Sequence, residues 1–163
     1  MQRAEIRELL ALLACGAAED AELDAMATAV ENAESDPELE FMRTLDADAA
    51  WYREVALQSA LGGYTVVSDK IDELHEQVSD QFEEPLPEFP EAFWAEPVDH
   101  YFAWLDTELA ARGEAHGGYR LVMLESGLDD NMVACVVRKP DVARILELAV
   151  SGSVRIEPAS AAP

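Results

Sequence analysis

The stretch YRLVMLESGLDDNMVACVVRKPDVARILELA, residues 119–149, decides the fold. Two apolar runs rich in β-forming residues, 119–125 and 132–138, flank a polar loop, and this pattern predicts a β-hairpin. Both runs are nearly continuous rather than alternating, which predicts that other elements cover both faces of the hairpin. Pro140 then begins a helix, because its fixed φ suits a first helical turn.

Helices precede this stretch and one short strand follows it. A final strand is expected at 154–157, and Tyr64–Val67 is expected to be no more than a strand-like connector. Helices followed by the order β-β-α-β predict an α+β fold. Apolar residues at helical spacing predict the earlier helices over residues 3–15, 19–33, 37–44, 47–61, 69–82 and 98–112.

A chain of 163 residues favours one domain. We expect a single compact α+β domain over 1–157, in which an N-terminal helical region is followed by the hairpin, a helix and the short strand. Its three parts are a helical part over 1–61, an acidic helix and proline-rich loop over 62–97, and a helix-β-β-α-β part over 98–157. The small, polar tail 158–163 is expected to fray.

Charge is the strongest compositional signal. The chain has 34 acidic and 11 basic residues, a formal net charge of −23. Residues 1–100 hold 25 acids and five bases, a net of −20, so the charge is concentrated there. Nucleic acids and anionic membranes are disfavoured as partners, because both require cationic protein surface. A basic protein would be attracted and steered, although solubility alone also explains an acidic surface.

Residues 12–16, Leu-Leu-Ala-Cys-Gly, resemble the cleavage box of a bacterial lipoprotein signal. Such a signal needs a basic start and an apolar run of roughly 7–15 residues. Here Glu5 and Glu8 interrupt the start, and the apolar run 9–14 has six residues. The helical interpretation is better, because one buried helix face would hold Ile6, Leu9, Leu10 and Leu13.

The two cysteines, Cys15 and Cys135, have no C-x-x-C spacing. We expect both to be reduced, buried, small apolar residues, as in a cytoplasmic protein. No apolar run approaches the ~18 residues of a membrane span, so no membrane association is expected.

The segment from Asp69 to Phe82 predicts an amphipathic helix with an acidic outer face. The loop EEPLPEFPEAFWAEP, residues 83–97, follows it and contains three further acidic residues after its first two. Its aromatic residues suit a protein interface, where buried aromatics act as hot spots, or they staple the loop to the core. The candidate partner-binding residues are Asp72, Glu73, Glu76, Asp80, Glu83, Phe89, Phe93 and Trp94.

Catalytic and metal-binding motifs are missing from the sequence. HEQVS, residues 75–79, lacks the second histidine of the H-E-x-x-H zinc motif, because Ser79 stands in its place. His75 also falls within the apolar stripe of its helix, so we expect a hydrogen-bonded core or boundary residue. The phosphate-binding glycine motifs and the nucleophile elbow do not occur either. We expect no catalytic residues, no metal and no cofactor.

Three stretches carry a resemblance to a known family. They are GGYTVVSDKIDEL (62–74), VDHYFAWLDTELAARG (98–113) and the hairpin-helix stretch 119–149. Over about residues 50–157 the chain resembles an uncharacterised family of small acidic bacterial proteins. The resemblance implies an α+β fold and a bacterial cytoplasmic setting, and it brings no catalytic residues.

Two classes of function remain. The first is a non-enzymatic module that engages a basic protein, as an immunity protein or an inhibitor would. The alternative is an enzyme or small-molecule-binding protein with a site between the proline-rich loop and the helix of Tyr101 and Trp104. A cavity with converging polar groups would favour the second class. We favour the first, because no catalytic motif fits the sequence.

Overall fold

Two antiparallel strands form the centre of the sheet. β2 (Tyr119–Glu125) and β3 (Met132–Arg138) pair with Leu121 opposite Val136 and Val122 opposite Cys135. The predicted hairpin is therefore confirmed. The computed structural model describes residues 1–125, 127–128 and 130–160, so part of the loop between the two strands lies outside the described residues.

Two shorter strands complete the sheet. β1 (Val66–Ser68) pairs with β3, and β4 (Arg155–Pro158) pairs with β2, so the order is β1-β3-β2-β4 and every pair is antiparallel. The expected final strand is present. Tyr64–Val67 was expected to be no more than a strand-like connector. Val66 and Val67 instead belong to an edge strand, whose partner strand lies more than sixty residues away in the chain.

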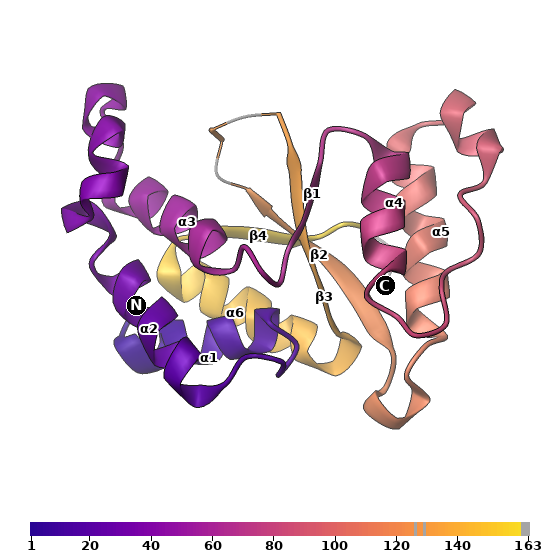
Figure 1. Ribbon diagram of the computed structural model, residues 1–163, viewed down its shortest axis with the longest axis horizontal. Coiled ribbons are helices and arrows are strands. Elements are labelled where there is room, and N and C mark those ends of the chain that lie inside the picture. The colour runs from indigo at the N-terminus through magenta and orange to yellow at the C-terminus, as the bar shows by residue number, and fades with distance from the viewer. Residues whose placement is uncertain (126, 129, 161–163) are drawn as a thin grey trace.

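Helices cover both faces of this sheet, as the continuous apolar runs predicted. Val133, Cys135 and Val137 of β3 face one core, together with the N-terminal helices and α6. Ala134 and Val136 face a second core with α4 and α5, because neighbouring strand residues point to opposite faces. Figure 1 shows α4 and α5 on the other side of the sheet from α1, α2 and α3. The fold is α+β.

The first core has the expected amphipathic helices. Ile6, Leu9, Leu10 and Leu13 are all buried, which confirms the buried face that argued against a signal sequence. The helices on this side are α1 (Arg3–Leu13), α2 (Asp20–Glu31), α3 (Ala49–Ala60) and α6 (Val142–Gly152), with 3₁₀ turns at Ala33–Ser35, Pro37–Leu45 and Lys139–Asp141.

The second core is formed by α4 (Ile71–Ser79) and α5 (Val98–Ala110), with 3₁₀ turns at Glu91–Ala95 and Glu114–His116. The prediction of one helix from Asp69 to Phe82 was too long. After Ser79 the chain continues in tight turns, in which the Phe82 N–H bonds the Ser79 carbonyl oxygen at 3.1 Å. The Phe82 ring then packs against Tyr119 instead of continuing the stripe of α4.

The expected fraying from residue 158 was wrong for residues 158–160. Pro158 pairs with Val122 at the end of β4, and the Ala159 N–H bonds the Leu121 carbonyl oxygen at 3.0 Å. Ser160 is buried. Residues 161–163 lie outside the described residues. None of the helices in the described part of the chain has the length and apolar character needed to cross a membrane.

Candidate partner-binding surface

The acidic residues of α4 lie where the sequence placed them, with one exception. Glu73, Glu76 and Asp80 are exposed, and Glu83 is exposed in the turn beyond the helix. Asp72 is half-buried, and its Oδ1 has no hydrogen-bond partner among the described residues. Asp72 therefore contributes less to the outer acidic face than its helical position indicated.

The acidic face extends well beyond α4. Residues 69–100 contain eleven acids and one base, Lys70, which bonds Glu73 at 2.6 Å. Glu96 lies 3.0 Å from His100. The other acids of this segment have no ion pair within the described part of the chain; they are Asp69, Asp72, Glu76, Asp80, Glu83, Glu84, Glu88, Glu91 and Asp99.

Acids on the opposite side of the sheet have a different environment. Glu8 accepts two hydrogen bonds of 2.7 Å from Arg144, and Asp24 accepts one of 2.9 Å from Arg7. Glu31 pairs with Arg3 at 3.0 Å. Five of the eleven basic residues pair with acids of the N-terminal helical part, whereas Lys70 is the one Lys or Arg paired with an acid of residues 69–100 within the described part of the chain. Most carboxylates of α4 and the following loop therefore have no ion pair among the described residues.

Phe89 and Phe93 attach the proline-rich loop to the second core. The Phe89 ring lies 5.4 Å from the Tyr101 ring, and the Phe93 ring lies 5.7 Å from the Trp104 ring, measured between centroids. Both side chains are half-buried. Of the two roles that the sequence left open, these contacts assign Phe89 and Phe93 to stapling the loop onto α5.

Trp94 remains a candidate for the other role, that of an aromatic residue in a protein interface. Its ring contacts Phe89 at a centroid distance of 5.3 Å, but the residue is 60% exposed. Val98 is also exposed, near the start of α5. Exposed tryptophan on a loop that is held by two packed phenylalanines presents a large apolar surface at little cost in conformational entropy.

His75 connects the loop to α4. Its Nε2 lies 2.9 Å from the Pro87 carbonyl oxygen, and the Tyr101 hydroxyl lies 3.3 Å from its Nδ1. The ring also stacks on Trp104. Burial lowers the pKa of His75, so the neutral ring donates from Nε2 to Pro87 and accepts from Tyr101. The sequence predicted a hydrogen-bonded core or boundary residue, and His75 is buried in the core.

Ser79 has a role that the sequence did not reveal. Its hydroxyl oxygen accepts the Leu86 N–H at 2.9 Å and so holds the turn between α4 and the loop. The HEQVS motif identified Ser79 only as a missing zinc ligand. Across the described part of the chain, no cluster of three or more His, Cys, Asp or Glu residues could hold a metal ion.

The space between the proline-rich loop and α5 is filled by aromatic rings rather than hollow. The adjoining groove, of about 440 Å³, lies instead between α4 and the start of the loop. Glu76, Asp80 and Glu88 contribute carboxylates to its lining, and His75 and Phe89 contribute rings. The structure thus brings part of the acidic face and part of the loop together around one shallow acidic groove.

Comparison with protein-family models, with curated proteins and with solved structures finds no match to this chain. Its function is therefore inferred from its own residues.

Proposed function

We propose that this chain is a non-enzymatic protein-binding module that engages a basic protein partner, as an immunity protein or an inhibitor does. Its contact surface, which we call the acidic surface, comprises the exposed acids of α4 and the proline-rich loop around Trp94. The observation that carries the proposal is the 60% exposure of Trp94 within a segment whose carboxylates are largely unpaired.

Charge and apolar contact would act at different stages of binding. The net charge of −23, together with the eleven acids and one base of residues 69–100, would attract and orient a basic partner, mainly by raising the association rate. Trp94 would then provide the apolar centre of the interface, because tryptophan is enriched among residues that dominate binding energy. The unpaired carboxylates around it would meet lysine or arginine side chains.

The alternative function, an enzyme or small-molecule site beside Tyr101 and Trp104, has less support. Aromatic rings fill that space, and both ring nitrogens of His75 have partners within the protein. His75 and Ser79 line the shallow groove beside it, but both are engaged within the protein, because the Ser79 hydroxyl accepts the Leu86 N–H. The acidic lining of the groove fits a lysine or arginine side chain of a protein partner.

The proposal includes a bacterial cytoplasmic setting. Both cysteines are free, which suits a reducing compartment. The acidic surface also argues against nucleic acids and anionic membranes as partners.

The test compares matched variants in affinity capture at low and high salt. Trp94→Ala removes the proposed anchor, whereas Phe41→Ala removes an aromatic side chain that is also exposed but belongs to the 3₁₀ segment Pro37–Leu45. We expect a basic protein to be retained at low salt by the wild type and by Phe41→Ala, and to be lost from Trp94→Ala. Retention of the same proteins by both variants, or capture of acidic proteins only, would contradict the proposal.

A further inference from the structure

The sheet has an incomplete edge beside β3. β1 covers only the first three residues of β3, with Val66 opposite Ala134 and Ser68 opposite Met132. β3 continues for four more residues to Arg138, and no strand in the described part of the chain pairs with them on that side.

Gln77 shows which way the backbone groups of this edge point. Its side chain accepts the Val67 N–H at 2.9 Å and donates to the Val67 carbonyl oxygen at 2.8 Å. The backbone N–H and C=O of Val67 therefore point away from β3, and those of its neighbours Val66 and Ser68 point towards it. Their partners on β3 are Ala134 and Met132, and by the same alternation the N–H and C=O of Val136 point to the β1 side.

β2 gives the same result independently. Leu121 lies opposite Val136, and its carbonyl oxygen accepts the Ala159 N–H on the far side, at 3.0 Å. The backbone N–H and C=O of Leu121 thus point away from β3. Leu121 and Val136 are therefore opposite each other without backbone hydrogen bonds between them. Both strands agree that the peptide groups of Val136 face the uncovered edge.

The two neighbouring edge positions already have partners. Ala134 faces β1. The Arg138 backbone N–H and guanidinium both contact the Cys15 sulfur, so the end of α1 replaces a strand there. Val136 lies between them and has no hydrogen-bond partner on this side within the described residues. The N–H and C=O of Val136 are therefore available to a group that enters from outside the fold.

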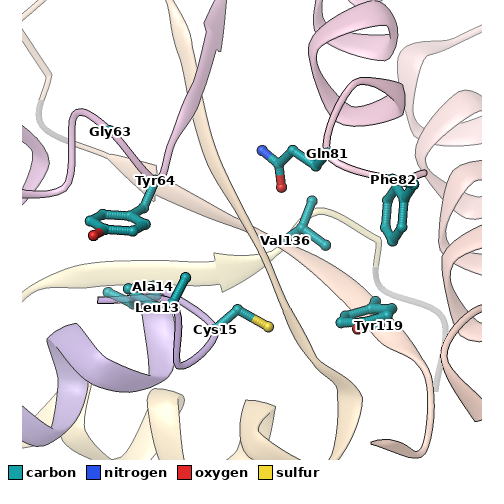
Figure 2. A pocket seen from close by; sticks show the side chains of 10 residues that line it. Leu13, Ala14, Cys15, Gly63, Tyr64, Gln81, Phe82, Tyr119 and Val136 are labelled. Carbon is teal, nitrogen blue, oxygen red and sulfur yellow. The ribbon is translucent and has the colours of Figure 1, made fainter. Parts of the chain in front are cut away.

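A cavity of about 500 Å³ lies at this position. Figure 2 shows Val136 near its centre, with Phe82 and Tyr119 on one side and Cys15 on the other. Tyr64 also lines the cavity, and its hydroxyl donates to Glu22 at 2.6 Å. The cavity therefore combines an aromatic wall with the N–H donor and the C=O acceptor of Val136.

We infer that this cavity accepts an extended peptide segment of a partner protein, which adds to the free edge of β3 as a short strand opposite Val136. This inference goes beyond the acidic surface and does not depend on it. The central residue of the segment would exchange two backbone hydrogen bonds with Val136. Cross-strand neighbours share a face, so its side chain would lie against Phe82 and Tyr119, and we expect it to be apolar or aromatic.

The probe is a set of blocked tripeptides, acetyl-Val-Xaa-Val-amide with Leu, Phe or Tyr in the centre, followed by ¹H–¹⁵N NMR. In the free protein the Val136 amide should exchange with solvent much faster than the amides of Cys135 and Val137, which face β2. Addition of peptide should shift the Val136 amide resonance and slow its exchange. Equal protection of the three amides in the free protein would overturn the inference.

The matched control is the same peptide with an N-methyl group on its central amide, which removes one donor and leaves the side chains unchanged. We expect its affinity to be about two- to tenfold lower, the range for one net hydrogen bond. Equal affinity for both peptides would indicate apolar binding without strand addition and would overturn the inference. A Val136 shift that depends on protein concentration but not on peptide would assign the edge to a second copy and would also overturn it.

Discussion

His75 Nε2 lies 2.9 Å from the carbonyl oxygen of Pro87, and this hydrogen bond fastens the proline-rich loop to α4. The Tyr101 hydroxyl, on the other side of the ring, lies 3.3 Å from Nδ1. Burial disfavours the charged ring and lowers the pKa of His75, so the neutral imidazole donates from Nε2 to Pro87 and accepts the Tyr101 hydroxyl at Nδ1. His75 thus holds the start of the loop against α4, while Phe89 and Phe93 hold its later part against α5.

Stability should fall as the solution is acidified through the range in which histidine titrates. Burial lowers the pKa of His75 from its ordinary value near 6.5, so the unfolded chain binds a proton first as the pH falls. The contribution of His75 is complete above pH ~6.5 and decreases below it until the folded protein is protonated too. Urea unfolding at pH 7.5 and at pH 5.5 measures this loss.

Many carboxylates also respond to pH, so the comparison needs a control. His75→Gln keeps a side chain that can donate to Pro87 but cannot take a proton in this range. His100 and His116 are exposed and present in both proteins. The free energy of unfolding should fall less between the two pH values in His75→Gln than in the wild type. An identical loss in both proteins would show that His75 does not control the pH dependence.

Among the ion pairs of the described residues, Glu54 has the most buried carboxylate, and its partner is Arg155. Glu54 is 5% exposed and accepts hydrogen bonds of 2.8–2.9 Å from the backbone N–H and the guanidinium of Arg155. Arg155→Met leaves this carboxylate with one donor. Because the guanidinium is itself half-exposed, the loss should be below that of a fully buried pair, at about 2 kcal/mol in urea unfolding.

Arg144→Met provides the matched control for Arg155→Met. Arg144 also binds a carboxylate through two hydrogen bonds, to Glu8, but both side chains are substantially exposed. Arg144→Met should therefore lower the free energy of unfolding by less than Arg155→Met does in the same unfolding series. The reverse order would mean that the burial of Glu54 does not determine the cost.

Cys135 should be inert in the folded protein. Its side chain is fully buried in β3, and burial raises the pKa of the thiol to about 12. In a Cys15→Ser variant, a thiol reagent at pH 8 should label Cys135 only after denaturant is added, because the thiolate is the reactive form. Rapid labelling under native conditions would show that the sheet opens. Cys135→Asp should prevent stable folding, since it buries an unpaired charge.

Phe93 and Trp94 are neighbours with opposite expected effects on stability. Phe93 contacts Tyr101 and Trp104, so Phe93→Ala should lower the free energy of unfolding by about 2 kcal/mol, below the full-core value because Phe93 is only half-buried. Trp94→Ala should change it by less than about 1 kcal/mol, because Trp94 is largely exposed. Chemical denaturation of both variants distinguishes them. A larger loss for Trp94→Ala would make Trp94 part of the staple instead of a free anchor.

Reversal of charge on the acidic surface should slow association with a basic partner. Glu76, Asp80 and Glu83 are suitable for reversal to Lys, whereas Glu73 is held by Lys70 and Ser68 and has a structural role. The triple variant should associate more slowly than the wild type at low salt, and the difference should shrink at high salt. Stopped-flow or surface-binding kinetics with the captured partner measures both rates.

The control reverses the same number of charges elsewhere, at Glu34, Glu38 and Glu157, which are exposed and lie away from the acidic surface. It has the same net charge as the test variant. A partner that recognises the acidic surface should bind this control faster than the test variant. Equal rates would mean that overall charge, and not this surface, governs association.

Local sequence predicted the elements whose signals lie within one segment. The buried face of α1 and the two apolar runs of the hairpin are examples, because burial imposes a period on each segment separately. β1 could not be predicted in this way. Its three residues become a strand because Ala134 and Met132 lie beside them, and that pairing depends on how α3 and α4 pack.

The ends of elements and the state of the loop depended on contacts that no spacing reveals. α4 ends at Ser79 because the Ser79 hydroxyl bonds Leu86 and the Phe82 ring turns towards Tyr119. The aromatic residues of the loop were correctly selected as candidates, but the division between the stapling Phe93 and the exposed Trp94 requires the position of α5. The open edge at Val136 follows only from strand register.

The two hydrogen bonds between the Gln77 side chain and the Val67 backbone affect how the protein behaves at high concentration. An uncovered edge strand can pair with another molecule, and repeated pairing leads to aggregation. The amide of Gln77 occupies both backbone groups of Val67 and so closes the outside of β1. Growth of the sheet on this side is thereby confined to the recessed position of Val136, where helices and loops on either side hinder the approach of a whole second sheet.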